Sequence, residues 1–447
     1  MGQNETPWKV IVVGAGFAGL TAARELTWAG HDVQVLEARD RIGGRTWTDE
    51  RMGMHLEMGG TWVHWMQPYV WTEITRYGQE IIASPVPDVV YWLTDGQVRH
   101  GTMAELDAKL AKPMAAIFSG SKDLFPLPYD PFHVLTNAAS DEALKQRFYG
   151  ADQGTILDAV RKGGFSQEEI DLVDSYWSAG YCGSTATASP MMAKLWVALS
   201  DNRLSLLDDC TLLYKLPGGM KGIYERIAAE IPGTIRLNTV VESIDHYDDG
   251  VTVHLGDGSD LSADAVVVTV PVNALRGIEF APELPQTTRA VIEEGLNSTG
   301  LKVWAKLRGH HSMMAYAPGS HGLSLVRTEY FLDDDTTVVV GFGADASKLD
   351  GSDPQAVEKV IRLWLPDVEV IDSASHDWVA DEWSRQTWAT FRTGQFTGGW
   401  RGFLEPTSRL VFAGADYSTG WNSFVDGAIQ SGISAASTIN DWAHAEK

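Results

Sequence analysis

Three glycines near the N-terminus have the spacing that a dinucleotide pyrophosphate requires. Residues 14–19 read Gly-Ala-Gly-Phe-Ala-Gly, and Glu37 follows 18 residues after the last glycine. The first glycine permits a tight turn, the second lets the backbone approach a phosphate, and the third lets a helix pack closely on a strand. Glu37 would accept hydrogen bonds from a ribose diol and would disfavour a 2′-phosphate, so NADP is not expected.

The neighbouring residues predict the elements that must position this site. Residues 9–13 (KVIVV) are typical of a buried strand, residues 17–29 of a helix that ends at Gly30, and residues 32–37 of a second strand. The glycines therefore lie at a strand-to-helix turn, where a helix N-terminus can receive phosphate charge. A glycine string alone would be weak evidence, but this context makes it strong.

A lysine-bearing strand is a second feature with chemical potential. Residues 300–308 (GLKVWAKLR) alternate between apolar and polar or aromatic side chains, which predicts a strand buried on one face. Lys302, Trp304 and Lys306 would share the other face. Because lysine is rarely buried, periodicity alone predicts that both lysines are solvated.

Length, charge and cysteine content narrow the class of protein. The 447 residues predict two domains, and a net charge of -24 argues against nucleic acid and anionic membranes as partners. The two cysteines, Cys182 and Cys210, suggest neither a disulfide framework nor a metal site. No secretory signal and no apolar run long enough to span a membrane is apparent, so we expect a soluble, cytoplasmic protein.

Four further segments, read with the βαβ start, resemble the flavin-dependent monoamine oxidase family, in the wider group that includes polyamine oxidases and L-amino acid oxidases. They are residues 37–46 (EARDRIGGRT), 57–62 (EMGGTW), 377–388 (DWVADEWSRQTW) and 411–428 (VFAGADYSTGWNSFVDGA). Glycines in the second segment would let backbone lie beside a planar ring. A helix over residues 425–436 would present its N-terminus to the negative charge of a reduced flavin.

The resemblance implies the fold and its division into domains. The fold class is α/β: a Rossmann-like, GR2-type FAD-binding domain interleaved with an α+β substrate domain made of a mixed sheet and a helical insertion. The FAD-binding domain would comprise residues 1–83, 215–277 and 396–447. The substrate-binding domain would comprise residues 84–214 and 278–395.

The resemblance also implies the residues that hold FAD. They are Gly14, Ala15, Gly16, Phe17, Ala18, Gly19, Glu37, Ala38, Arg39, Gly44, Arg45, Gly59, Gly60, Thr61, Trp62, Val241, Trp378, Trp383, Asp416, Phe424 and Val425. Some family members attach the flavin through a cysteine, but Thr387 occupies that position here, so FAD is expected to be bound without a covalent bond. Asp416 replaces the family's usual glutamate in the C-terminal motif.

The expected catalytic residues are Lys302, Trp388 and Phe424. In the family, the matching lysine holds a water beside the flavin and is linked to reoxidation. The resemblance therefore implies that Lys302 lies at the active site, in contrast to the solvated position that periodicity alone predicts. Trp388 and Phe424 match the aromatic pair that flanks the substrate; two such rings could equally be core.

The expected substrate is an apolar, aromatic or cyclic amine, in a cavity lined by His64, Trp65, Trp304 and the aromatic pair. The partners would be this amine and O2, reduced to H2O2, and a homodimer is left open. Three alternatives also stay open. An L-amino acid oxidase would need an arginine such as Arg99, Arg203 or Arg327 for the carboxylate. A C–C desaturase or porphyrinogen-type oxidase, and a non-enzymatic FAD-binding scaffold or NAD-linked reductase, are the others.

Overall fold

The computed structural model describes residues 7–445, and segments from both ends and the middle of the chain build a five-stranded parallel sheet. The strand order is β10-β2-β1-β14-β21. These strands are β1 (Lys9–Val13), β2 (Asp32–Leu36), β10 (Ile235–Arg236), β14 (Ala265–Val268) and β21 (Leu410–Phe412). Strands β1, β14 and β21 are almost entirely buried, as expected for apolar strands of a parallel sheet covered on both faces.

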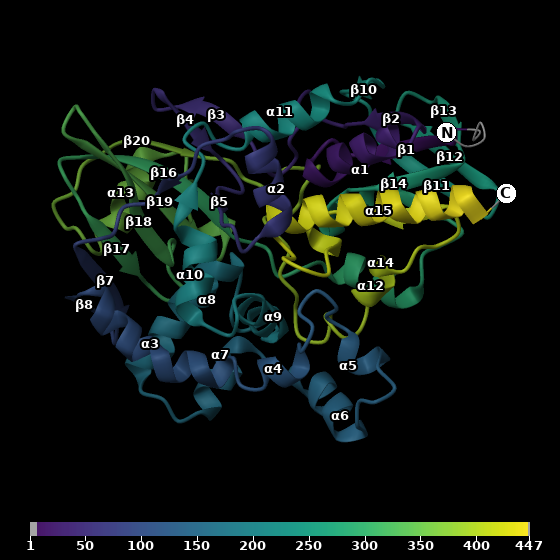
Figure 1. The fold of residues 1–447 in the computed structure, drawn as a ribbon. Helices are drawn as coiled ribbons and strands as arrows, with labels where there is room; N and C mark the ends of the chain where they lie inside the picture. Colours follow the sequence, from purple (N-terminus) through teal and green to yellow (C-terminus); the bar gives the residue numbers. More distant parts are fainter. Residues whose placement is uncertain (1–6, 446–447) are drawn as a thin grey trace.

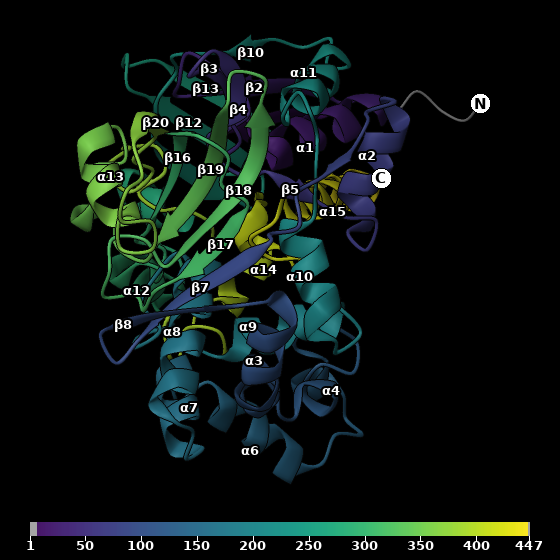
Figure 2. The same ribbon diagram turned by 90° about the vertical axis from the view of Figure 1, so that its left-hand side faces the viewer.

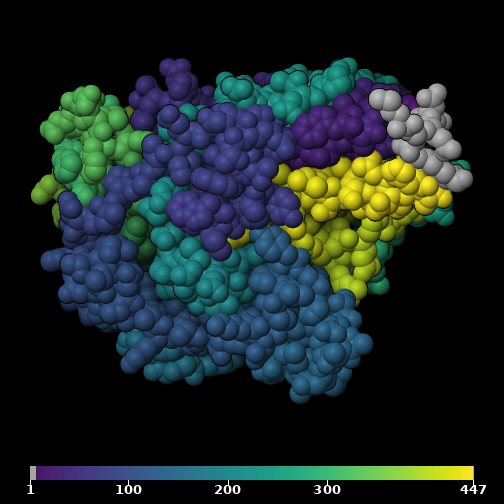
Figure 3. All heavy atoms as spheres, in the orientation of Figure 1, coloured from purple at the N-terminus to yellow at the C-terminus, as the bar shows by residue number. Residues whose placement is uncertain are grey.

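The helix after β1 packs against the last helix of the chain. Helix α1 (Phe17–Trp28) lies beside α15 (Val425–Ala445), and Figures 1 and 3 show the yellow C-terminal helix against the purple N-terminal segment. Close approach requires small residues, because a Cβ on Gly432 would lie 2.5 Å from the Ala18 carbonyl oxygen. The predicted strands and helix of the βαβ start are confirmed, and the predicted helix from residue 425 extends to Ala445.

A four-stranded sheet, in the order β13-β12-β11-β15, accompanies the parallel sheet. Its strands are β11 (Val241–Tyr247), β12 (Gly250–Leu255), β13 (Asp260–Ala263) and β15 (Glu279–Ala281). Strand β15 pairs in parallel with β11, so this sheet extends beyond residue 277, where the first domain was predicted to pause. All of the predicted domain limits, including this one, remain a prediction.

A mixed seven-stranded sheet builds the opposite side of the molecule, as Figure 2 shows. Its order is β20-β16-β19-β18-β17-β7-β8, and only β17 and β7 pair in parallel. The strands are β7 (Val89–Thr94), β8 (Gln97–Gly101), β16 (Leu301–Arg308), β17 (Met313–Tyr316), β18 (Leu325–Leu332), β19 (Thr336–Gly343) and β20 (Val370–Ser375).

Strand β16 is the predicted lysine-bearing strand, and both of its faces are covered. Val303, Ala305 and Leu307 join an apolar core with helix α13 (Pro354–Ile361). On the opposite face, Lys302 and Trp304 are also buried. The prediction that only one face of this strand is buried was therefore wrong. Strands that are distant in sequence and the dinucleotide-binding elements enclose the face that carries the lysines.

Most helices lie in the insertion between β8 and β9, confirming the predicted helical region (Figure 2). They are α3 (Met103–Ile117), α4 (Ser121–Leu124), α5 (His133–Thr136), α6 (Glu142–Ala151), α7 (Ile156–Lys162), α8 (Gln167–Tyr181), α9 (Met191–Leu199) and α10 (Leu204–Leu212). Capping boxes at Thr102 and Ser166 begin α3 and α8, because each hydroxyl and the glutamate three residues later satisfy free backbone N–H groups. Helix α8 packs across β17, β18 and β19.

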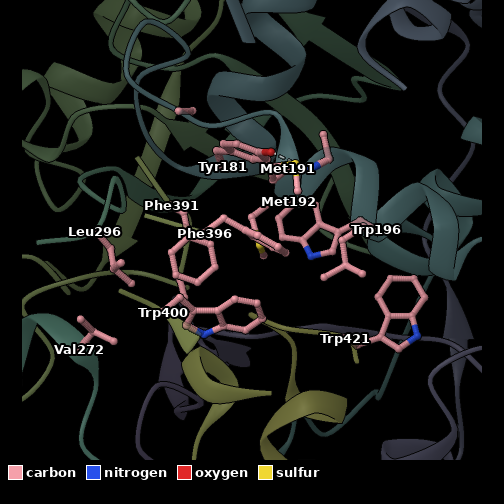
Figure 4. Packing of buried hydrophobic residues seen from close by; sticks show 14 of the residues in the cluster. Tyr181, Met191, Met192, Trp196, Val272, Leu296, Phe391, Phe396, Trp400 and Trp421 are labelled. Atoms are coloured by element: carbon pink, nitrogen blue, oxygen red, sulfur yellow. Dashed lines mark hydrogen bonds between the residues drawn. The ribbon is translucent and has the colours of Figure 1, made fainter. Parts of the chain in front are cut away.

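The remaining elements connect these parts. They are β3 (Thr48–Arg51), β4 (Met54–Glu57), β5 (Trp62–Val63), β6 (Ile82–Ala83), β9 (Tyr214–Lys215), α2 (Pro68–Arg76), α11 (Lys221–Ala229), α12 (Gln286–Glu294) and α14 (Arg401–Leu404). Figure 4 shows Phe391, Phe396 and Trp400 packed together, with ring centroids 4.9 to 5.9 Å apart. This packing anchors the irregular segment that follows Trp388. Within residues 7–445, no helix combines the length and apolar character needed to cross a membrane.

Candidate active site

A large cavity runs from the glycine turn after β1 to the inner face of the seven-stranded sheet. Gly14, Gly16, Phe17 and Ala18 line its dinucleotide end. A Cβ on Gly14, whose φ is +105°, would lie 2.4 Å from Thr269 Oγ1. Ala15 and Gly19 do not line the cavity. A Cβ on Gly19 would lie 2.0 Å from the Gly14 carbonyl oxygen, so this glycine allows close helix packing.

Glu37 lies at the end of β2 and is fixed by backbone donors. Its carboxylate accepts hydrogen bonds from the N–H groups of Ala15, at 2.8 Å, and Arg39, at 2.9 Å. Glu37 is buried but lines the cavity together with Ala38 and Arg39. The Arg39 guanidinium is in turn held by Asp381, at 2.7 Å. The ribose acid predicted from the sequence is thus oriented toward the dinucleotide end.

Arg45 lines the middle of the cavity, and Asp416 holds it there. The Arg45 guanidinium lies 2.5 Å from one oxygen of Asp416 and donates to the Thr387 carbonyl at 2.8 Å. The other Asp416 oxygen accepts from the Val272 backbone N–H and the Gln386 amide, both at 3.0 Å. Asp416 is fully buried and does not line the cavity. In this structure Asp416 positions Arg45, and its predicted contact with the cofactor stays a prediction.

The segment after β4 forms a side-chain-poor wall. Gly59, Gly60, Thr61 and Trp62 all line the cavity. A Cβ on Gly59 would lie 1.9 Å from the Arg45 carbonyl oxygen, so only glycine fits. The backbone is thereby open to a planar ring.

Lys302 is buried against this wall, with a side chain 3% exposed. Its ammonium donates to the carbonyls of Glu57 and Gly59, both at 2.7 Å, and to Thr61 Oγ1 at 2.5 Å. These three acceptors use all the donors of a protonated lysine. Burial lowers the pKa of Lys302 to about 7, although the nearby Glu57 carboxylate opposes this shift. Lys302 therefore lies on the cavity wall, as predicted from the resemblance.

Glu57 was not among the predicted residues, yet it supports the lysine. Its carboxylate accepts from the N–H groups of Trp47 and Met220 and from the Thr48 hydroxyl. Burial raises the pKa of Glu57, while these donors and Lys302 stabilise its charged form. An acid at the start of the EMGGTW segment was the available sequence signal.

The aromatic pair lies on two different walls of the same cavity. Trp388 donates from Nε1 to the Gly180 carbonyl at 3.0 Å and packs against Phe342, with ring centroids 5.9 Å apart. Phe424, next to the start of α15, packs against Trp196, labelled in Figure 4, with centroids 5.4 Å apart. The two rings thus line the same cavity from different segments of the chain.

Several predicted flavin-side residues also meet here. Val241, Trp378, Trp383, Phe424 and Val425 line the cavity. The N-terminus of α15 is presented to the cavity through the last two. Asp426, by contrast, turns away and caps the start of α2.

Three predicted cavity residues lie elsewhere. Trp304 is 1% exposed and donates to the Glu57 carbonyl at 3.0 Å, so it packs behind Lys302. His64 is buried, and its Nδ1 accepts from the Met66 N–H. Trp65 is 48% exposed and packs on His64 with centroids 4.0 Å apart. None of the three lines the cavity in this structure, and their contact with the substrate stays a prediction.

The part of the cavity wall that comes from the helical insertion and the seven-stranded sheet was largely missed from the sequence. It is formed by Tyr176, Trp177, Trp196, Leu207, Thr211, Leu212, Tyr316, Leu325 and Phe342. These residues come from α8, α9, α10 and the central strands of the mixed sheet. They carry no contiguous motif, because strand register and helix packing bring them together.

The arginines considered for a substrate carboxylate are also outside the cavity. Arg99 pairs with Glu168 at 3.0 Å on the surface. Arg203 is exposed beside Asp201. The buried Arg327 donates to the carbonyls of Leu212 and Pro85 and lies 2.8 Å from Glu329.

A dinucleotide-binding turn joined to an aromatic cavity with a buried lysine defines a flavin-dependent oxidoreductase. The chain belongs to the flavin-containing amine oxidoreductase family, whose model matches residues 17–440. It is 33% identical to pseudooxynicotine dehydrogenase of a Pseudomonas species, over 96% of this chain and 86% of that relative. It is 29% identical to (S)-6-hydroxynicotine oxidase of Paenarthrobacter nicotinovorans, over 97% of this chain and 99% of that relative.

Solved structures support the same fold. Cyclohexylamine oxidase from Brevibacterium oxydans superimposes with a TM-score of 0.81 at 22% identity, covering 98% of this chain and 99% of that one. The family membership and the dinucleotide site identify the cofactor as FAD and the protein as an amine-acting oxidoreductase. The family and the α/β fold predicted from the sequence are confirmed.

Proposed function

We propose that this enzyme oxidises a small apolar, aromatic or cyclic amine to an imine and transfers the electrons to O2. One observation carries the substrate class. The lining residues that come from α8, α9, α10 and the seven-stranded sheet are mostly aromatic and aliphatic, and Lys302 is the only charged residue among them. Such a cavity binds a neutral amine through its apolar body.

FAD would be held by the residues already placed along the cavity. The glycine turn and the α1 N-terminus would receive the pyrophosphate, and Glu37 the ribose. The glycine wall at Gly59 and the N-terminus of α15 would border the flavin ring. We propose non-covalent attachment, because neither cysteine nor histidine occurs among the lining residues and Thr387 occupies the cysteine position of other members.

When bound, FAD accepts two electrons from the carbon–nitrogen bond of the amine. Trp388 and Phe424 would hold the amine between them and exclude water from the reacting carbon. In the overall reaction the amine loses two electrons and two protons, O2 takes them up as H2O2, and water hydrolyses the imine. No acid or base is required from the aromatic pair.

Lys302 would assist through charge. A protonated Lys302 already donates to Glu57, Gly59 and Thr61, so it has no further N–H for a bound water. In the protonated form of Lys302, which predominates below about pH 7, its positive charge in a water-poor site would stabilise negative charge that develops during reduction of O2. This proposal differs from a role in which the lysine orients a water.

The main competing hypothesis is that the reduced enzyme passes its electrons to an acceptor other than O2. One relative is named a dehydrogenase and another an oxidase, so relatives of this chain differ in the acceptor that their names imply. A dehydrogenase would also oxidise amines but would react slowly with O2.

Stopped-flow mixing of the amine-reduced enzyme with O2 would distinguish these hypotheses. Rapid return of the flavin absorbance with one H2O2 per amine supports the oxidase, and slow return with fast reduction of a dye or acceptor protein supports the dehydrogenase. Lys302→Met should slow the reaction with O2 at least tenfold. The control Lys306→Met lies on the same strand face, where Lys306 pairs with Asp334 at 2.8 Å, and should leave the rate unchanged.

An amino acid substrate is less well supported. Arg99, Arg203 and Arg327 do not line the cavity. Arg45 lines it and lies at the Thr387 carbonyl next to Trp388, but its guanidinium is already paired with Asp416. A carboxylate would therefore lose its water shell without a bidentate partner.

A further inference from the structure

A row of side chains crosses the mixed sheet and forms the floor of the cavity. Lys302 pairs with Phe342, Phe342 with Leu325, and Leu325 with Tyr316. Directly paired residues point to the same face of a sheet, and all four line the cavity. Neighbouring strands lie about 4.8 Å apart, so Phe342 and Tyr316 are separated by roughly 10 Å of backbone.

Helix α8 packs over the same strands, and residues along its length line the cavity from the Trp388 end to the Tyr176 end. Gly180 accepts the hydrogen bond from Trp388, and Tyr176 lies four residues earlier on the same helix. This is about one turn, or roughly 6 Å, along the helix axis. Both residues line the cavity. The end of the cavity at Trp388 and the end at Tyr176 and Tyr316 are therefore separated by roughly 6 to 10 Å, which is the length of a small molecule.

The two phenols at the far end differ in their hydrogen bonding. The Tyr176 hydroxyl donates to Asp208 at 2.5 Å and is therefore occupied. Tyr316 is 5% exposed, and its hydroxyl has no hydrogen-bond partner within residues 7–445. The Tyr316 hydroxyl oxygen is not among the fully enclosed atoms that lack a partner, so part of its surface stays accessible, and Tyr316 lines the cavity. A ligand that brings an acceptor atom to this hydroxyl can form a hydrogen bond with it.

We propose that the Tyr316 hydroxyl donates a hydrogen bond to an acceptor atom at the end of the substrate remote from the oxidised amine. The substrate class is then an amine joined by an apolar linker to a ring nitrogen or carbonyl oxygen. Phe342 and Leu325 contact the linker, and Tyr176 closes the cavity beside the acceptor. This inference rests on the proposed function for the position of the amine end.

Matched ligands test the inference by binding alone. Phenylbutylamine and pyridylbutylamine differ by one ring C–H replaced by a nitrogen acceptor. Their dissociation constants are measured calorimetrically, without O2, for the FAD-loaded wild type, Tyr316→Phe and the control Tyr330→Phe. Tyr330 lies on neighbouring β18 and is not among the lining residues. Tyr316→Phe should reduce the preference for the pyridyl ligand about tenfold, and Tyr330→Phe should not.

The length of the linker provides a second comparison. Benzylamine and pyridylmethylamine place the ring close to the amine, so Tyr316→Phe should leave their relative affinities unchanged. An unchanged preference for the longer pair in Tyr316→Phe overturns the inference, as does an equal loss in Tyr330→Phe or in the short pair. If no amine reduces the wild-type flavin, the proposed function fails, while the dissociation constants still decide the role of Tyr316.

Discussion

Replacing Lys302 with methionine should change how the stability of the protein depends on pH. Burial lowers the pKa of Lys302 from 10.5 to about 7. Between these values the unfolded chain binds a proton that the folded protein does not, so the free energy of unfolding rises with pH. The proton linkage destabilises the folded state by about 4 kcal/mol at pH 7 and by about 1.5 kcal/mol at about pH 9.5. Methionine has no such linkage.

The wild type should therefore gain about 3 kcal/mol relative to Lys302→Met between these two pH values. The assay is reversible urea unfolding with saturating FAD, followed by far-ultraviolet circular dichroism, for both proteins at both pH values. Comparing the two proteins removes the contributions of groups that titrate alike in both. Lys306→Met, at the partly exposed end of the same strand face, provides the control for loss of a lysine. An identical stability difference between wild type and Lys302→Met at both pH values would refute the depressed pKa.

Three other predictions concern the cavity and its cofactor. Trp388→Ala and Phe424→Ala each remove an aromatic wall, so kcat/KM for an aromatic amine should fall at least tenfold in steady-state assays with FAD content unchanged. Acid precipitation should release all flavin into the supernatant, and yellow precipitated protein would contradict non-covalent binding. Asp416→Asn weakens the hold on Arg45 and should lower FAD affinity about tenfold in fluorescence titration of the apoprotein, whereas the exposed Asp334→Asn should not.

The dinucleotide end could be predicted from sequence because its determinants are local. Gly14, Gly16 and Gly19 serve one turn, and the strand and helix on either side are contiguous with it. Each glycine meets a specific steric demand that a short pattern records. Glu37 follows directly after the next strand, and its spacing from the glycines is restricted by the length of α1.

The substrate end could not be predicted in the same way. The alternation in β16 correctly indicated a strand, but burial of Lys302 depends on the wall at Gly59 and on strands far away in sequence. Trp304 follows the same alternation, yet Lys302 and Glu57 cover it, so it packs behind the cavity. Phe342 and Tyr316 enter the cavity through sheet register, which no single segment encodes.

The most direct test of the proposed function is anaerobic mixing of the purified, FAD-loaded enzyme with amines, with the flavin absorbance as the readout. Apolar aromatic and cyclic amines should bleach the flavin without any nicotinamide, and amino acids should not. Failure of every amine to bleach it, or reduction by amino acids alone, would contradict the proposed function.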